Sequence, residues 1–131
     1  MPVAFADVNR ILAIALGGVI GSLGRYAVAR LFDDWNPEAL PVATLTVNIV
    51  GCLAIGAIAA SASIAAGPSW LRPFLITGVL GGFTTFSALA LETGLLLDAG
   101  RVVVAAGYVV VTMAAGLAAV RLGQLAVEAR R

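Results

Sequence analysis

The segment from Gly78 to Ser87 reads Gly-Val-Leu-Gly-Gly-Phe-Thr-Thr-Phe-Ser and lies in an uncharged run from Pro73 to Leu91. A run of this length can span a bilayer as a helix. Its three glycines and two threonines favour a helix that breaks near the middle of the membrane. Irregular backbone at that depth is tolerated only where it is buried in protein or lines a polar cavity. The alternative is a continuous glycine-rich helix that serves packing alone. The Thr-Thr-Phe-Ser sequence that follows the glycines favours a break with a functional role over this alternative.

The composition is that of a membrane protein, with 61% hydrophobic and 11% charged residues and a mean hydropathy of +1.05. Soluble domains carry about a quarter charged residues. The charge-free windows predict an all-α protein with four transmembrane helices in a single domain covering residues 1–131. We expect these helices at about 9–31, 41–65, 73–97 and 102–124.

The residue types that are missing exclude several classes of function. The chain has no histidine and one cysteine, Cys52, which falls within the second predicted helix. A histidine-based catalytic site, a side-chain metal centre and an intrachain disulfide are therefore excluded. No nucleophile–base pair or acid–base dyad is visible, so we expect no enzyme. The net charge of +1 indicates no nucleic-acid partner.

The distribution of arginines predicts the orientation of the chain in the membrane. Four spans place both termini on the same side, and that side holds five of the eight basic residues. Basic loops stay in the cytoplasm, so we expect both termini to be cytoplasmic. The five are Arg10, Arg72, Arg121, Arg130 and Arg131, against Arg25, Arg30 and Arg101 on the other side.

Glycines along the helices predict close packing between them. Small residues allow membrane helices to approach one another. The glycines with this predicted role are Gly17, Gly21, Gly24, Gly51, Gly56 and Gly116. Packing within one chain explains many of them. A broken third helix also has freed carbonyls that need ligands, so we expect at least a dimer.

Asn48 is the clearest polar residue within a predicted helix. It shares one face with Thr44 and Cys52, which lie four residues before and after it. A buried amide needs hydrogen-bond partners or a water-filled path. Hydrogen bonding between helices and the lining of a pore explain it equally well. Tyr108 and Thr112 form a similar hydroxyl stripe on the fourth helix, which suits either packing or contact with an anion.

Three further residues in or near the membrane have both a functional and a structural interpretation. Arg25, at the end of the first helix, either has a functional role or extends to the membrane surface. Glu92 follows the predicted break and lies near the surface or faces a vestibule. Phe86 directly follows the two threonines, and the positive edge of its ring can meet an anion.

Taken together, three motifs resemble those of the CrcB, or Fluc, fluoride channel family. The first is Gly-Gly-Val-Ile-Gly-Ser-Leu-Gly-Arg-Tyr over residues 17–26, and the second is Thr-Leu-Thr-Val-Asn-Ile-Val-Gly over residues 44–51. The third and most specific lies within Gly78 to Ser87. The number of spans, the length and the order of the motifs also agree, so the resemblance covers nearly the whole chain.

The resemblance implies an antiparallel dimer of four-helix subunits in the inner membrane of a bacterium. It implies passive, fluoride-selective conduction through two narrow pores at the dimer interface. HF enters cells by diffusion and ionises in the cytoplasm, and the channel lets the membrane potential expel the trapped fluoride. The family also has a structural Na⁺ at the dimer centre, held by main-chain carbonyls that correspond to Gly81 and Thr84.

The resemblance also implies pore residues. The pore asparagine corresponds to Asn48, and the first ring of a phenylalanine pair to Phe86. Arg25 corresponds to the arginine of the first helix, and Glu92 remains a candidate vestibule residue. The remaining candidate pore contacts are Thr85, Ser87, Tyr108 and Thr112.

Position 89 departs from the family pattern. The second pore phenylalanine of the family is replaced by Leu89, which has no ring edge for an anion. A homodimer would carry this change in both pores, whereas a heterodimer with a homologous subunit keeps one pore intact. The arginine bias also favours a fixed orientation, so we expect one subunit of a heterodimer.

Two other functions fit a small four-helix membrane protein. A proton-coupled exporter of cationic drugs needs a carboxylate within the membrane, and the first helix has none. A non-conducting assembly subunit would explain the packing glycines and Leu89, but it leaves the clustered motifs unexplained.

Overall fold

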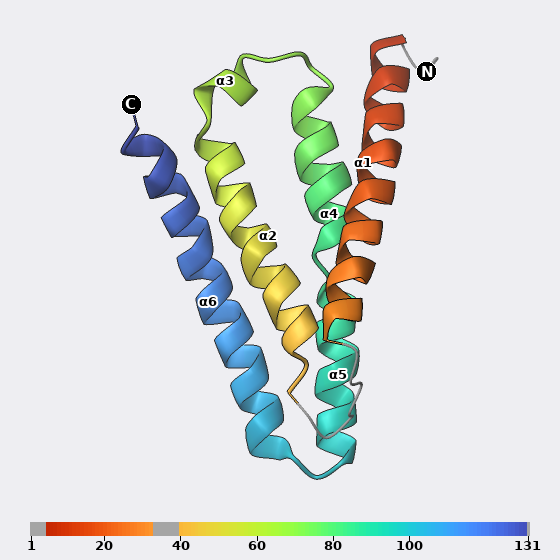
Figure 1. Ribbon diagram of the computed structural model, residues 1–131, viewed down its shortest axis with the longest axis vertical. Coiled ribbons are helices and arrows are strands. Elements are labelled where there is room, and N and C mark those ends of the chain that lie inside the picture. Colours follow the sequence, from red (N-terminus) through yellow and green to blue (C-terminus); the bar gives the residue numbers. More distant parts are fainter. Residues whose placement is uncertain (1–4, 33–39, 131) are drawn as a thin grey trace.

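The computed structural model describes residues 5–32 and 40–130, and its regular structure over these ranges is helical (Figure 1). The first helix is α1 (Phe5–Leu31) and the second is α2 (Val42–Ala60), which a short helix, α3 (Ala62–Ala65), follows. The third span is divided into η1 (Pro73–Leu80), α4 (Gly81–Phe83) and α5 (Phe86–Asp98). The chain closes with α6 (Val102–Glu128).

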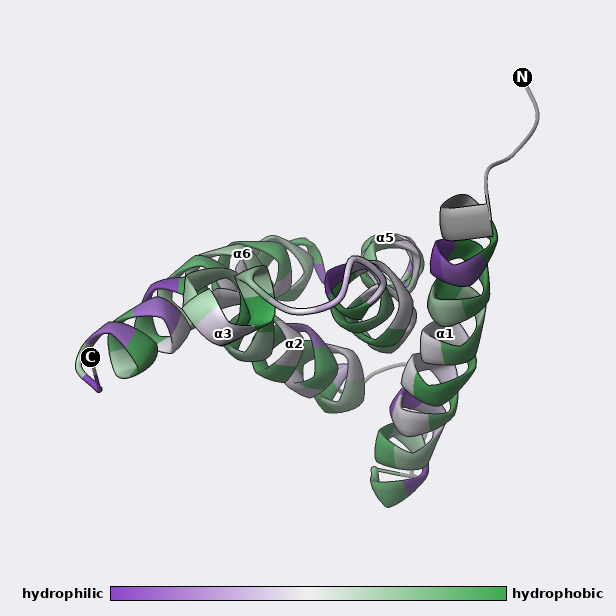
Figure 2. Cartoon of the chain, turned by 90° about the horizontal axis from the view of Figure 1, so that it is seen from above, coloured by the Kyte–Doolittle hydropathy of each residue, from purple (hydrophilic) through white to green (hydrophobic). Residues whose placement is uncertain are grey.

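Four segments of the described residues are long and apolar enough to cross a membrane. They are Val8–Leu31, Val42–Ala60, Pro73–Asp98 and Val102–Glu128. The prediction of an all-α membrane protein with four spans is confirmed. The first described turn of α1 and the last turn of α6 lie at the same end of the bundle, beside α3 (Figure 1). Seen from above, apolar residues cover most of the helix surfaces (Figure 2).

The ends of the helices differ from the expected positions by a few residues. α2 ends at Ala60 rather than at residue 65, because Ser61 has an extended backbone with φ −77° and ψ 111°. The Ser61 hydroxyl then accepts a hydrogen bond from the Ile64 N–H at 3.3 Å and begins α3. α1 begins before residue 9, and α6 continues past residue 124 to Glu128.

The third span is interrupted at two threonines, whereas its glycines are helical. Thr84 has φ −80° and ψ 160°, and Thr85 has φ −152° and ψ 116°, so both are extended. Before the break, the Gly81 N–H bonds to the Ile76 carbonyl, five residues back, as in a π-helix. The Thr84 N–H and hydroxyl both donate to the Leu80 carbonyl, each at 2.9 Å. The threonine side chains therefore end one helix and begin the next.

The glycines of the third span serve close packing against α1. A Cβ atom added to Gly78 would lie 2.8 Å from the Ile14 carbonyl oxygen, and one added to Gly82 would lie 2.7 Å from that of Gly18. From the other side, a Cβ on Gly17 would lie 2.6 Å from the Phe74 carbonyl oxygen. α1 packs chiefly on η1 and α4. The two helices can approach this closely only because no side chain stands between them.

Glycines also bring α2 and α6 together, the other extensive helix pair. A Cβ on Gly56 would overlap the backbone of Val120, and one on Gly123 would overlap the backbone of Leu53. The sequence pattern does not predict this packing role for Gly123. Gly24 makes a looser contact, because its added Cβ would lie 3.5 Å from the Phe83 ring.

The adjacent glycines Gly17 and Gly18 on α1 provide a matched test of the close packing between α1 and η1. Gly17→Ala places its methyl group against the η1 backbone, whereas an added Cβ on Gly18 meets nothing within 4 Å. We expect Gly17→Ala to destabilise the protein by about 1–3 kcal/mol, the usual cost of overpacking. Gly18→Ala should be neutral or slightly stabilising. Thermal unfolding in detergent measures both, and equal unfolding midpoints for the two variants would contradict the crossing.

Candidate functional site

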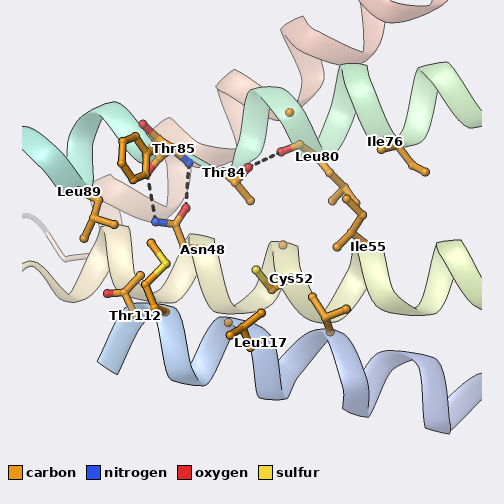
Figure 3. Close-up of a pocket in the computed structure, with 16 residues that line it drawn as sticks. Asn48, Cys52, Ile55, Ile76, Leu80, Thr84, Thr85, Leu89, Thr112 and Leu117 are labelled. Atoms are coloured by element: carbon orange, nitrogen blue, oxygen red, sulfur yellow. Dashed lines mark hydrogen bonds between the residues drawn. The ribbon is translucent and has the colours of Figure 1, made fainter. Parts of the chain in front are cut away.

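A groove of about 350 Å³ runs along the face that α2, the third span and α6 share. The break in the third span forms one wall, and α6 forms the opposite wall (Figure 3). Several sequence-predicted site residues line this groove, namely Asn48, Gly81, Thr84, Thr85, Phe86, Leu89 and Thr112. Most of the remaining lining is apolar and comes from Ile55, Ile76, Leu80, Met113, Leu117 and Val120. Polar groups are therefore concentrated at the break.

The side chain of Asn48 binds the backbone of the break with two hydrogen bonds (Figure 3). Its Oδ1 accepts from the Thr85 N–H at 2.8 Å, and its Nδ2 donates to the Thr85 carbonyl at 3.1 Å. The amide thus satisfies both backbone groups of an extended residue that neither neighbouring helix can satisfy. Nδ2 carries a second hydrogen. That hydrogen has no protein partner in the described parts of the chain.

The break also removes helical donors from two carbonyl groups. In a continuous helix the Gly81 carbonyl would accept from the Thr85 N–H, and the Thr84 carbonyl from the Ala88 N–H. Here the Thr85 N–H donates to Asn48, and the Ala88 N–H donates to the Thr85 hydroxyl at 3.1 Å. Carbonyl oxygens released in this way suit a hard cation. These two carbonyls are the ones that the family resemblance implies as cation ligands.

Phe86 and Leu89, which occupy the positions of the family's two pore phenylalanines, have opposite environments. The Phe86 side chain is 73% exposed and stands at the groove. Leu89 is only 3% exposed and packs in a cluster with Leu96, Ala105 and Tyr108. The exposed ring is available to a ligand or to a partner subunit, whereas the leucine fills space beside α6.

Glu92 is buried in the bundle and is held by two hydroxyl groups. The Thr44 hydroxyl donates to Oε1 at 2.7 Å, and the Tyr108 hydroxyl donates to Oε2 at 2.6 Å. The Thr112 hydroxyl donates back to the Tyr108 carbonyl at 2.7 Å. All four of these side chains are buried, and they link α2, α5 and α6. Helical spacing predicts that Thr44 lies on the same face of α2 as Asn48. Only the folded structure shows that Thr44 bonds to Glu92 on α5.

Other predicted residues lie outside the groove. Ser87 is exposed, and its hydroxyl lies 3.2 Å from that of Thr85. Arg25 is half-buried on α1, which packs chiefly on η1 and α4, and no described residue of α1 lines the groove. Tyr108 and Glu92 do not line the groove either. The structure therefore brings Tyr108 and Glu92 together with Thr44 in a second polar cluster.

These features define a class: a multi-pass helical membrane protein whose interrupted third span presents polar groups to a groove. The sequence profile described as "CrcB-like protein, Camphor Resistance (CrcB)" matches residues 12–124. This chain belongs to that family.

Curated relatives cover most of the chain. The protein named "Fluoride-specific ion channel FluC" of Paracoccus denitrificans is 49% identical over 86% of this chain and 89% of its own length. The protein of the same name from Methylobacillus flagellatus is 45% identical over 87% and 91%. "Fluoride-specific ion channel FluC 2" of Nocardia farcinica is 45% identical over 86% and 81%.

The contact between Asn48 and Thr85 predicts a stability difference between two neighbouring groove residues. Asn48→Ala leaves the buried Thr85 backbone unsatisfied, so we expect it to cost about 1–3 kcal/mol. Cys52→Ala, one turn along α2 and also in the groove, removes a thiol and no hydrogen bond that holds the break. Thermal unfolding in detergent should therefore show the lower midpoint for Asn48→Ala. The reverse order would rule out the proposed role of Asn48.

Proposed function

We propose that this chain is a subunit of a fluoride-selective ion channel through which fluoride leaves the cell passively. Support comes from its family and from relatives named as fluoride-specific ion channels. Those names also agree with the expectation that the chain is not an enzyme. The observation that carries the proposal is the arrangement of Asn48, Thr85 and Phe86 at a broken membrane helix.

The chemistry of the groove suits a small anion. The second hydrogen of Asn48 Nδ2 can be donated to it, and the exposed Phe86 ring can offer its positive edge. Neither group carries a full charge, so an anion can bind and still leave. The hydroxyls of Thr85, Ser87, Tyr108 and Thr112 are the further proposed pore contacts. Arg25 is proposed for the vestibule. Glu92 does not keep that role, because it is buried and both of its carboxylate oxygens accept hydrogen bonds within the bundle.

A structural Na⁺ is proposed at the break. The carbonyls of Gly81 and Thr84 would hold it, because the break diverts their helical donors and their oxygens suit a hard cation. The ion would supply charge that fixes the break and would take no part in transport. Two carbonyl oxygens do not complete the shell of such a cation, so a second subunit would supply the rest.

The second subunit is proposed to be a homologous chain in antiparallel orientation. The groove and the exposed Phe86 ring leave a surface for it to cover. Leu89 stands at the position of the family's second pore phenylalanine and is buried in the core beside Tyr108. A homologue with phenylalanine at that position would supply the missing ring, so the heterodimer remains our proposal.

The proposed location is the inner membrane of a bacterium, with both termini in the cytoplasm. Four spans make the chain a multi-pass membrane protein, and the relatives come from bacteria. Five of the eight basic residues lie on the side of the termini, which supports the orientation. A fixed orientation is what a heterodimer subunit needs.

Fluoride efflux from lipid vesicles tests the function. The complex purified from its native membranes through a tag on this chain should release fluoride and no chloride, as a fluoride electrode and a chloride electrode measure. The chain purified alone from a heterologous host should release little fluoride, because both of its pores would lack a ring at position 89. Rapid efflux from the single chain would contradict the heterodimer, and no fluoride efflux from the complex would contradict the channel.

Two exposed apolar residues of α5 provide the matched variants for this experiment. Phe86 stands at the groove and Leu91, which is 63% exposed, does not line it. Phe86→Ala should reduce fluoride efflux at least about tenfold, the effect of one lost interaction of about 1.4 kcal/mol. Leu91→Ala should leave efflux unchanged. Equal effects of the two substitutions would refute the assignment of Phe86.

A further inference from the structure

Arg101 is a half-buried cation whose Nη1 nitrogen is fully buried. It lies in the turn between α5 and α6, at the end of the bundle opposite α3 (Figure 1). Its Nη1 is the one buried side-chain nitrogen or oxygen in the described parts of the chain that makes no hydrogen bond. A buried charged donor without an acceptor is unfavourable, because it has lost its hydrogen bonds to water. No described residue accepts a hydrogen bond from Nη1, so this nitrogen can donate to a bound anion.

The position of Arg101 connects it to the polar cluster around Glu92. Its carbonyl accepts the Ala105 N–H at 2.9 Å, and Ala105, Tyr108 and Thr112 then follow on one buried face of α6. Its own N–H donates to the Leu96 carbonyl at 2.9 Å, one turn beyond Glu92 on α5. Along the helix, seven residues separate Arg101 from Tyr108 by about 10 Å. Partly buried charges are screened less by salt than exposed ones, so the charge of Arg101 can act over such a separation.

The acidic residue on this face makes a nearby cation favourable for the binding of an anion. Among the described residues, the hydrogen-bond partners of the Glu92 carboxylate are two hydroxyl groups, and neither is a cation. A carboxylate at this depth repels an anion that passes along the face of Tyr108 and Thr112. A guanidinium at the entrance offsets that repulsion and offers donors to the anion. It remains charged at every physiological pH.

We propose that Arg101 binds the permeant anion at this end of the protein and delivers it to the face of Tyr108 and Thr112. This inference rests on the proposed channel function and adds an entrance site to it. A lipid phosphate has the same anionic chemistry and is the other source of an acceptor for Nη1. We assign the site to the small anion, because Arg101 begins the buried polar face.

The test compares fluoride efflux from vesicles that contain the natively purified complex and its variants. Arg101→Gln should raise the half-saturating fluoride concentration about tenfold, the loss of one charge-assisted hydrogen bond. The maximal rate should remain unchanged. Inert salt, which screens the arginine, should slow efflux at low fluoride in the wild type but not in this variant. Arg101→Lys should restore most of the salt dependence.

Arg72→Gln is the control, because Arg72 is exposed and lies at the other end of the bundle. It should leave the half-saturating concentration unchanged. If Arg101→Gln changes only the maximal rate, or only the response to anionic lipid in the vesicles, the entrance site is overturned. If the wild-type complex releases fluoride normally and Arg101→Gln matches it, the inference fails while the channel stands. If the wild type releases none, both fail.

Discussion

The pair of hydrogen bonds between the Asn48 side chain and the Thr85 backbone is the constraint on which the site depends. A membrane helix cannot leave an N–H and a carbonyl unsatisfied at the depth of the bilayer. Asn48 supplies a donor and an acceptor from a neighbouring helix and stands in for the missing helical turn. Once Thr85 is held in this way, its hydroxyl is free to begin α5, and the carbonyls of Gly81 and Thr84 lose their helical donors. One side chain therefore shapes both the groove and the proposed cation ligands.

The second constraint is the close packing that surrounds the break. The glycines of α1 and of the third span let η1 lie directly against α1, and Gly56 and Gly123 do the same for α2 and α6. Between these two pairs lies the groove, with the Glu92 cluster linking α2, α5 and α6. Within the groove the polar groups lie mainly at the break, and most of the remaining lining is apolar.

Much of the fold could be predicted from the sequence, because charge-free windows report directly on membrane spans. The location of the break could not be predicted in detail. The glycines and the threonines together predict an interruption of the third helix. In the structure the glycines lie where helices pack closely, and the interruption occurs at Thr84 and Thr85 alone. Asn48 was recognised as a polar residue without an assigned partner. Its bond to Thr85, like that of Thr44 to Glu92, joins residues far apart in sequence, and no local pattern encodes such a pairing.

The most direct test of the account is a solid-state NMR measurement in lipid bilayers. With ¹⁵N in the Thr85 amide and ¹³C in the Asn48 carboxamide, a dipolar coupling should join the two labels, because the Thr85 nitrogen lies 2.8 Å from Asn48 Oδ1. The Thr84 and Thr85 chemical shifts should be those of extended backbone. Helical shifts at these threonines together with no coupling would contradict the account, because the third span would then be a continuous helix.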